Sequence, residues 1–136
     1  MTNSRNKGAA FEREIAQELH RLLGINFKRD LDQYRERDRG DLICDVDAFP
    51  FLIECKRYAG GGFLSAWWQQ AHSAALEARK RPAVIYKFDR KPTMVRVQLR
   101  AAMECISRKK WSAEDRHLID VDLEGFAYLC REGLAT

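Results

Sequence analysis

The sequence has no long hydrophobic run. No apolar stretch approaches the ~20 residues needed to span a bilayer, and the opening residues, "MTNSRNKGAAFERE", lack the apolar segment of a secretory signal. We therefore expect a cytoplasmic protein without a membrane association. Hydrophobic residues make up 46% of the 136 residues and charged residues 32%, which suits one folded domain over residues 1–136.

Familiar nucleotide, zinc and acyl-transfer motifs are also missing from the sequence. There is no Walker loop, no Gly-x-Gly-x-x-Gly and no Ser-His-Asp arrangement. Gly60–Gly62 is not followed by a Gly-Lys-Ser/Thr step, so we interpret it as a flexible loop. The cysteines are spaced too irregularly for a zinc knuckle and are predicted to be reduced, mostly buried thiols. No small-molecule cofactor is expected. The cysteines are Cys44, Cys55, Cys105 and Cys130.

Basic residues exceed acidic ones by a moderate margin. Lys and Arg total 24 against 20 for Asp and Glu, which gives a net charge of +4 and an isoelectric point near 9.0. The basic residues gather in four short runs, "KRDLDQYRERDRG", "KRY", "EARKRP" and "SRKKW". One such run is usually a solvated face. Four in a chain of this length favour a polyanionic partner such as nucleic acid.

The first predicted element is an amphipathic helix over residues 6–24, ending at Gly24. Its apolar side chains recur at roughly 100° per residue and form one arc. Glu12 falls inside this arc, whereas Glu14 lies well away from it. An acid on the core side of a helix needs a partner or a metal ion. Both interpretations of Glu12 stay open on the helix alone: a pair with a nearby Arg, or a metal site. The arc consists of Phe11, Ile15, Leu19, Leu22 and Leu23.

The remaining pattern alternates strands and helices. The order α-β-β-β-α-β-β predicts an α/β fold in which helices flank a central mixed β-sheet. The tail adds a short helix, a strand and a closing helix. In order, the predicted elements are strands at 27–34, 41–47 and 51–58, a helix at 64–80 that Pro82 ends, strands at 83–88 and 93–99, a helix at 101–108, a strand at 117–123 and a helix at 124–132.

The strand at residues 51–58 interrupts its own apolar pattern with charge. Alternate side chains share a face, so Glu54 and Lys56 point the same way, and Asp41 lies one hairpin away. Two converging carboxylates offer the hard oxygen ligands that suit Mg²⁺ or Mn²⁺. Lys56 stands about 6–7 Å farther along the same face, close enough to act on an attacking water or a phosphate. The alternative is a modest surface pair at a strand end.

These residues carry a resemblance to a known family. "GD" at residues 40–41 followed by "FLIECKR" at 51–57 resembles the active-site signature of the PD-(D/E)XK nuclease superfamily, with Gly40 where proline often stands. "KGAAFERE" at 7–14 is similar to the opening of archaeal-type Holliday junction resolvases. "WWQQA" resembles that family's Gln-Ala step, and "PAVIYKF" the strand after it. The resemblance covers residues 7–90, and a strand-then-helix ending like that of the final third also occurs in phage-encoded relatives.

The resemblance implies a restriction-endonuclease-like core and a role for each site residue. It makes Asp41 and Glu54 direct ligands of Mg²⁺, for which Mn²⁺ can substitute, and the Cys55 backbone carbonyl a third ligand. Glu12 acts on the metal through water, with Glu14 as its competitor. Lys56 becomes the catalytic lysine. Gln70 becomes a supporting polar residue, with Gln69 as its competitor.

The resemblance also implies DNA contacts and a dimer. Phosphate contacts without base reading are expected from basic residues within or beside the catalytic elements. In the archaeal proteins a Ser-rich loop that touches DNA precedes the Asp, and here "YRERDRG" replaces it. The predicted phosphate contacts are Lys7, Arg13, Arg35, Arg37, Arg39 and Arg57.

The implied activity is that of a homodimeric endonuclease that cuts branched double-stranded DNA at four-way junctions. Trp67 and Trp68 are assigned to the dimer interface rather than to base stacking, and Asp45 and Asp47 to solvent-facing strand positions. Two alternatives remain: a restriction-like or nicking DNase that acts on ordinary duplex, and a non-catalytic DNA-binding module.

Overall fold

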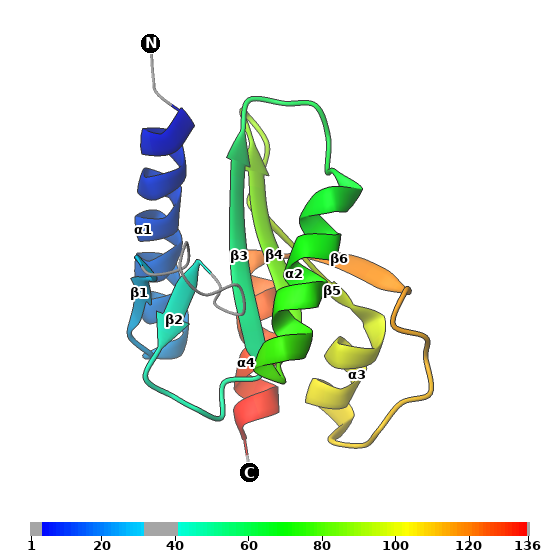
Figure 1. Ribbon diagram of the computed structural model, residues 1–136. Helices are drawn as coiled ribbons and strands as arrows, with labels where there is room; N and C mark the ends of the chain where they lie inside the picture. The colour runs from blue at the N-terminus through cyan, green and yellow to red at the C-terminus, as the bar shows by residue number, and fades with distance from the viewer. Residues whose placement is uncertain (1–3, 32–40, 136) are drawn as a thin grey trace.

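The computed structural model describes residues 4–31 and 41–135 and confirms the predicted order of elements (Figure 1). A mixed sheet is flanked by helices, as expected. In chain order the elements are α1 (Ser4–Leu23), β1 (Phe27–Arg29), β2 (Leu42–Cys44), β3 (Phe51–Tyr58), α2 (Ser65–Ala78), β4 (Arg81–Phe88), β5 (Met94–Gln98), α3 (Leu99–Ser107), β6 (Leu118–Asp122) and α4 (Leu123–Leu134).

The six strands follow the order β1-β2-β3-β4-β5-β6 across one sheet. Only the central pair β3–β4 is parallel, and its register runs from Phe51↔Arg81 to Tyr58↔Phe88. A parallel pair needs a crossover connection, which α2 supplies. The two longest strands therefore lie at the centre of the sheet, and the charged end of β3 is held on one side by β4.

Helices cover both faces of the sheet. The main core fills the side of α1, α3 and α4, where Phe11, Ile15 and Leu19 of α1 meet Phe126 of α4 and the inward side chains of the strands. In Figure 1, α2 lies in front of β3 and β4 and α4 behind them. On the α2 face, Leu52 packs against small alanines of the helix. The alternation of β3 thus places Leu52 and Glu54 under α2.

Two predicted boundaries differ from the structure. The second helix ends at Ala78 rather than at residue 80. Arg79 adopts the left-handed backbone conformation (φ 58°), and its N–H donates to the carbonyls of Ala75 and Leu76. Pro82 does not end the helix; it lies inside β4, next to the strand's first residue, where proline is tolerated. The first strand stops at Arg29, and residues 32–34 of the predicted strand lie outside the described residues.

The assignment of Trp67 to a dimer interface is wrong. Its side chain is 6% exposed and stacks on Tyr58 with 5.0 Å between ring centroids, and on Phe88 at 6.1 Å. Phe63 completes the cluster edge-on at 5.1 Å. The indole therefore fixes the start of α2 against the ends of β3 and β4. Trp68 is half-buried, and its interface role stays a prediction.

No helix within residues 4–31 and 41–135 combines the length and the apolar character needed to cross a bilayer.

Trp67→Ala is expected to lower the free energy of unfolding by about 3–5 kcal/mol, because it leaves a cavity among stacked rings. Trp68→Ala, one position along the helix, is the matched control and should cost much less. Urea unfolding of both variants measures the difference. If both variants lost the same free energy of unfolding, the assignment of Trp67 alone to the core would be contradicted.

Candidate active site

Asp41 is fixed to the edge of β3 by its backbone and by its side chain. Its N–H donates to the Ile53 carbonyl at 2.8 Å, and its Oδ2 accepts the Cys55 N–H at 2.7 Å. Within the described residues β2 pairs with β3 only at Leu42↔Ile53, so the carboxylate lies where the two strands separate. The N–H and carbonyl of one strand residue face the same edge. The Cys55 carbonyl therefore faces the Asp41 side of β3.

Glu54 is buried beside Asp41, with 5% of its surface exposed. This excludes the surface pair as an explanation of Glu54 and Lys56. Burial, and then the neighbouring Asp41 carboxylate, raises the pKa of Glu54 to about 9. Burial raises the pKa of Asp41 as well, although the Cys55 amide opposes the rise. A hydrogen bond from protonated Glu54 to Asp41 raises the pKa of Glu54 further and lowers that of Asp41.

Glu12 faces the same cluster from α1 and is 8% exposed, whereas Glu14 is exposed. The helical pattern therefore distinguished the two acids correctly. Burial raises the pKa of Glu12, Asp41 raises it further, and Arg29 lowers it. Arg29 Nε lies 3.4 Å from Glu12 Oε2. The two interpretations of Glu12 are compatible, because the carboxylate has an Arg partner and also faces Asp41.

Arg29 is the site residue that sequence reasoning missed. It ends β1, and the register Arg29↔Leu42 places it beside the strand that follows Asp41. The next residue, Asp30, donates its N–H to the Asp41 carbonyl at 2.9 Å. No local motif marks Arg29. Only the pairing of β1 with β2 brings its guanidinium to the acids.

Lys56 is half-buried on the face of β3 that carries Glu54, and its ammonium lowers the pKa of both Asp41 and Glu54 against the larger effect of burial. On α2, Trp67 and Ala71 are buried against the sheet. Helical geometry places Gln70 at the border of this buried arc and Gln69 on the opposite side. Both are exposed, and the arc favours Gln70.

The predicted phosphate contacts separate into three groups. Lys7 and Arg57 converge on Asp89, at 3.2 and 2.7 Å, beside the ends of β3 and β4. Arg13 is exposed on α1. The third group, Arg35, Arg37 and Arg39, lies outside the described residues.

Asp45 and Asp47 are exposed, as expected, but they follow β2 rather than forming part of a strand. The cysteines are free thiols: two are buried and two half-buried.

The oxygen atoms of this cluster fit a divalent cation of the Mg²⁺ type. Two adjacent carboxyls that share a proton can exchange it for a cation, and carboxylate and carbonyl oxygens are ligands that Mg²⁺ accepts. In the described part of the chain, no three acidic, His or Cys side chains converge closely enough to hold an ion by themselves.

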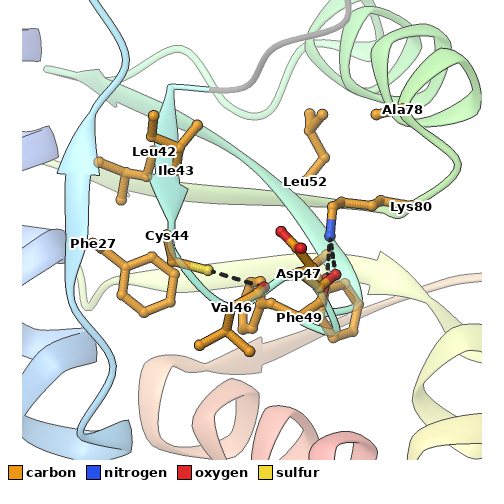
Figure 2. A pocket seen from close by; sticks show the side chains of 11 residues that line it. Phe27, Leu42, Ile43, Cys44, Val46, Asp47, Phe49, Leu52, Ala78 and Lys80 are labelled. Atoms are coloured by element: carbon orange, nitrogen blue, oxygen red, sulfur yellow. Dashed lines mark hydrogen bonds between the residues drawn. The ribbon is translucent and has the colours of Figure 1, made fainter.

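An apolar cavity of about 270 Å³ lies elsewhere, between β2, the start of β3 and the end of α2. None of Glu12, Asp41, Glu54 and Lys56 lines it. Figure 2 shows the Lys80 ammonium closing one side, where it donates to the carbonyls of Asp47 and Phe49. The cavity has no cluster of titratable groups and adds nothing to the site.

Without divalent cations, the free energy of unfolding is expected to fall as pH rises from about 5 to 8. Folded Glu54 keeps its proton up to about pH 9, while the unfolded side chain loses it near its ordinary value. The native state therefore binds more protons across this window, and the slope reaches up to about 1.4 kcal/mol per pH unit for one proton. Urea unfolding in EDTA measures it. Glu54→Gln should flatten the slope; an unchanged slope would contradict the raised pKa.

Comparison with known proteins identifies the family to which the chain belongs. A family model described as "Phage putative PDDEXK endonuclease" matches residues 3–131. The structure is similar to that of Archaeoglobus fulgidus Hjc, a Holliday junction resolvase from an archaeal hyperthermophile. The TM-score is 0.56 at 16% identity, over 92% of this chain and 99% of that one. No curated protein sequence matches the chain. The chain belongs to this phage family of PD-(D/E)XK endonucleases and has the nuclease fold that Hjc also has.

Proposed function

We propose that the protein is a metal-dependent, structure-selective endonuclease that hydrolyses phosphodiesters at four-way DNA junctions as a homodimer. The observation that carries the proposal is the contact of half-buried Asp41 with buried Glu54, together with Lys56 on the strand face of Glu54. Membership in an endonuclease family and the likeness to Hjc support it. An inactive DNA-binding descendant would have no reason to keep all three residues.

Asp41, Glu54 and the Cys55 carbonyl would hold Mg²⁺, or Mn²⁺ in its place, and Glu12 would act through water. When bound, such an ion stabilises the charge that develops on the phosphate and lowers the pKa of a bound water. Lys56 then lies where an ammonium can orient the attacking water or face the phosphate oxygens. Arg29 holds Glu12 in place through their 3.4 Å contact and lowers its pKa against the larger effect of burial.

Asp41→Asn and Glu54→Gln are each expected to abolish cleavage, because each removes a proposed ligand of the cation, while DNA binding stays intact. Binding tightens if the substitution removes a charge that repels phosphate, as in Asp41→Asn. Gel-based cleavage with Mg²⁺ and binding in EDTA measure the two properties separately. Glu14→Gln, on the exposed side of α1, is the matched control. Wild-type turnover in either site variant would refute the assignment.

Lys56→Ala is expected to slow the chemical step by a factor of about 10² or more, the scale of a positioned proton-transfer or charge-stabilising group. Calorimetry with Mg²⁺ should find metal binding little changed. A full cleavage rate in this variant would reduce Lys56 to a phosphate contact.

The substrate is tested by the ratio of two cleavage rates. A four-way junction and a linear duplex with the sequence of one arm are compared under the same conditions, with Mg²⁺ and with EDTA. The proposal expects Mg²⁺-dependent cutting of the junction and little cutting of the duplex. Equal rates would favour the duplex-cutting alternative, and no cutting with Mg²⁺ would remove the enzymatic proposal.

A further inference from the structure

Two basic runs of the sequence take no part in the candidate site. Residues 79–81 follow α2 and open β4, and residues 108–110 follow α3. Neither run contains an acid. In the sheet Arg81 pairs with Phe51, three residues before Glu54, which puts its backbone about 10 Å from the site along the strand. The runs therefore lie toward the opposite end of the central strands from Lys7 and Arg57.

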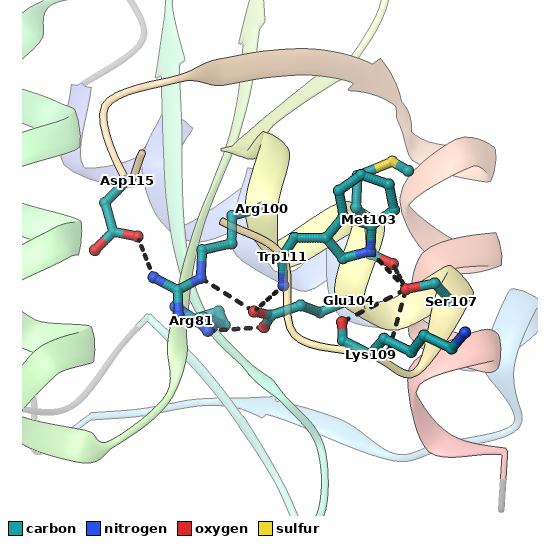
Figure 3. A network of polar contacts seen from close by, with 8 residues as sticks. All are labelled: Arg81, Arg100, Met103, Glu104, Ser107, Lys109, Trp111 and Asp115. Atoms are coloured by element: carbon teal, nitrogen blue, oxygen red, sulfur yellow. Dashed lines mark hydrogen bonds and ion pairs between the residues drawn. The ribbon is translucent and has the colours of Figure 1, made fainter. Parts of the chain in front are cut away.

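Glu104 of α3 holds the two runs side by side. Its Oε2 accepts from Arg81 at 2.8 Å, and its backbone carbonyl accepts the Arg108 N–H at 2.9 Å. Its Oε1 is occupied by Arg100 at 3.0 Å. Figure 3 shows Arg81 and Arg100 both reaching this carboxylate. The Glu104 carboxylate is therefore paired with two arginines, Arg81 and Arg100.

Of the six basic side chains in the two runs, two bind protein acceptors and four have no partner among the described residues. Lys80 donates to the carbonyls of Asp47 and Phe49, and Arg81 to Glu104. The other four side chains are exposed, and within the described residues none of them donates to a protein acceptor. We call the surface they form the C-cap surface. It consists of Arg79, Arg108, Lys109 and Lys110.

Two of these residues occupy a backbone conformation that disfavours them. Arg79 has φ 58° and Arg108 φ 59°, each at the left-handed position just past a helix. Glycine is the usual residue there because it has no Cβ to clash. In the described part of the chain, every non-glycine residue with positive φ is an arginine; the third is Arg90. A side chain kept where glycine is more stable indicates a use for that side chain.

We propose that the C-cap surface binds the phosphate backbone of the DNA substrate outside the scissile region, along one duplex arm. This rests on the proposed function and extends it to a second contact. Exposed, unpaired cations suit phosphates, which accept from Arg and Lys without any sequence requirement. The site itself carries buried acids that repel DNA. Contacts beyond Arg81, whose backbone lies about 10 Å from the site, hold the substrate without opposing the cation that those acids would bind.

The test replaces both capping arginines by glycine, Arg79→Gly with Arg108→Gly. Binding of a fluorescent four-way junction is measured by anisotropy in EDTA at several salt concentrations, together with the melting temperature. Affinity is expected to fall about tenfold, and the slope of log K against log salt to decrease by about 2, one for each lost phosphate contact. The melting temperature should stay the same or rise, because the left-handed strain is relieved.

A structural role would give the reverse result. If the arginine side chains instead stabilise the fold by packing, the melting temperature falls and the salt slope does not change. Lys109→Gln with Lys110→Gln provides a second variant without any backbone effect and should also lower the affinity and the slope. Arg21→Ala with Arg131→Ala removes two exposed arginines elsewhere and is the charge-matched control, expected to bind as wild type.

The outcomes separate this inference from the proposed function. Wild-type protein that binds the junction while both surface variants keep the wild-type affinity and slope would overturn the C-cap surface alone. Equal weakening in the control would overturn it too, since net charge would then explain the effect. Wild-type protein that binds no DNA would overturn both proposals.

Discussion

The hydrogen bond from the Cys55 amide to the Asp41 carboxylate is the contact on which the candidate site depends. At 2.7 Å it fixes an acid to the backbone of β3 where β2 and β3 separate. Cys55 lies between Glu54 and Lys56 on β3. The same contact therefore fixes where the Asp41 carboxylate lies relative to both of these charged side chains. The parallel pairing with β4 and the packing of α1 hold β3 itself in place.

The arrangement is electrostatically unfavourable without a cation. Glu54 and Glu12 are almost fully buried, the pKa values of all three acids are raised, and burial is the first cause in each case. Arg29 and Lys56 offset part of this cost. A fold selected for stability alone would replace such a cluster with apolar side chains. The presence of such a cluster in an otherwise regular core supports the proposal that these residues bind a cation.

Local pattern predicted most of the fold and the burial of Glu12. Helical periodicity placed Glu12 on the core side of α1 and Glu14 on its exposed side, and strand alternation put Glu54 and Lys56 on one face. Features that depend on long-range pairing were missed: Arg29 reaches the site only through the β1–β2 register, and the partners of Trp67 come from β3, β4 and the loop between β3 and α2. The end of α2 at Ala78 was also missed, since left-handed arginine has no sequence signature.

Within the described residues, several cations near the candidate site are already engaged: Lys7 and Arg57 share Asp89, and Arg29 holds Glu12. Exposed cations without a side-chain partner also lie past the ends of α2 and α3. Coulomb attraction between exposed groups is screened over about 8–10 Å at physiological salt. Cations at that separation can therefore attract DNA while scarcely altering the pKa values of the carboxyls, so binding and chemistry can be set independently.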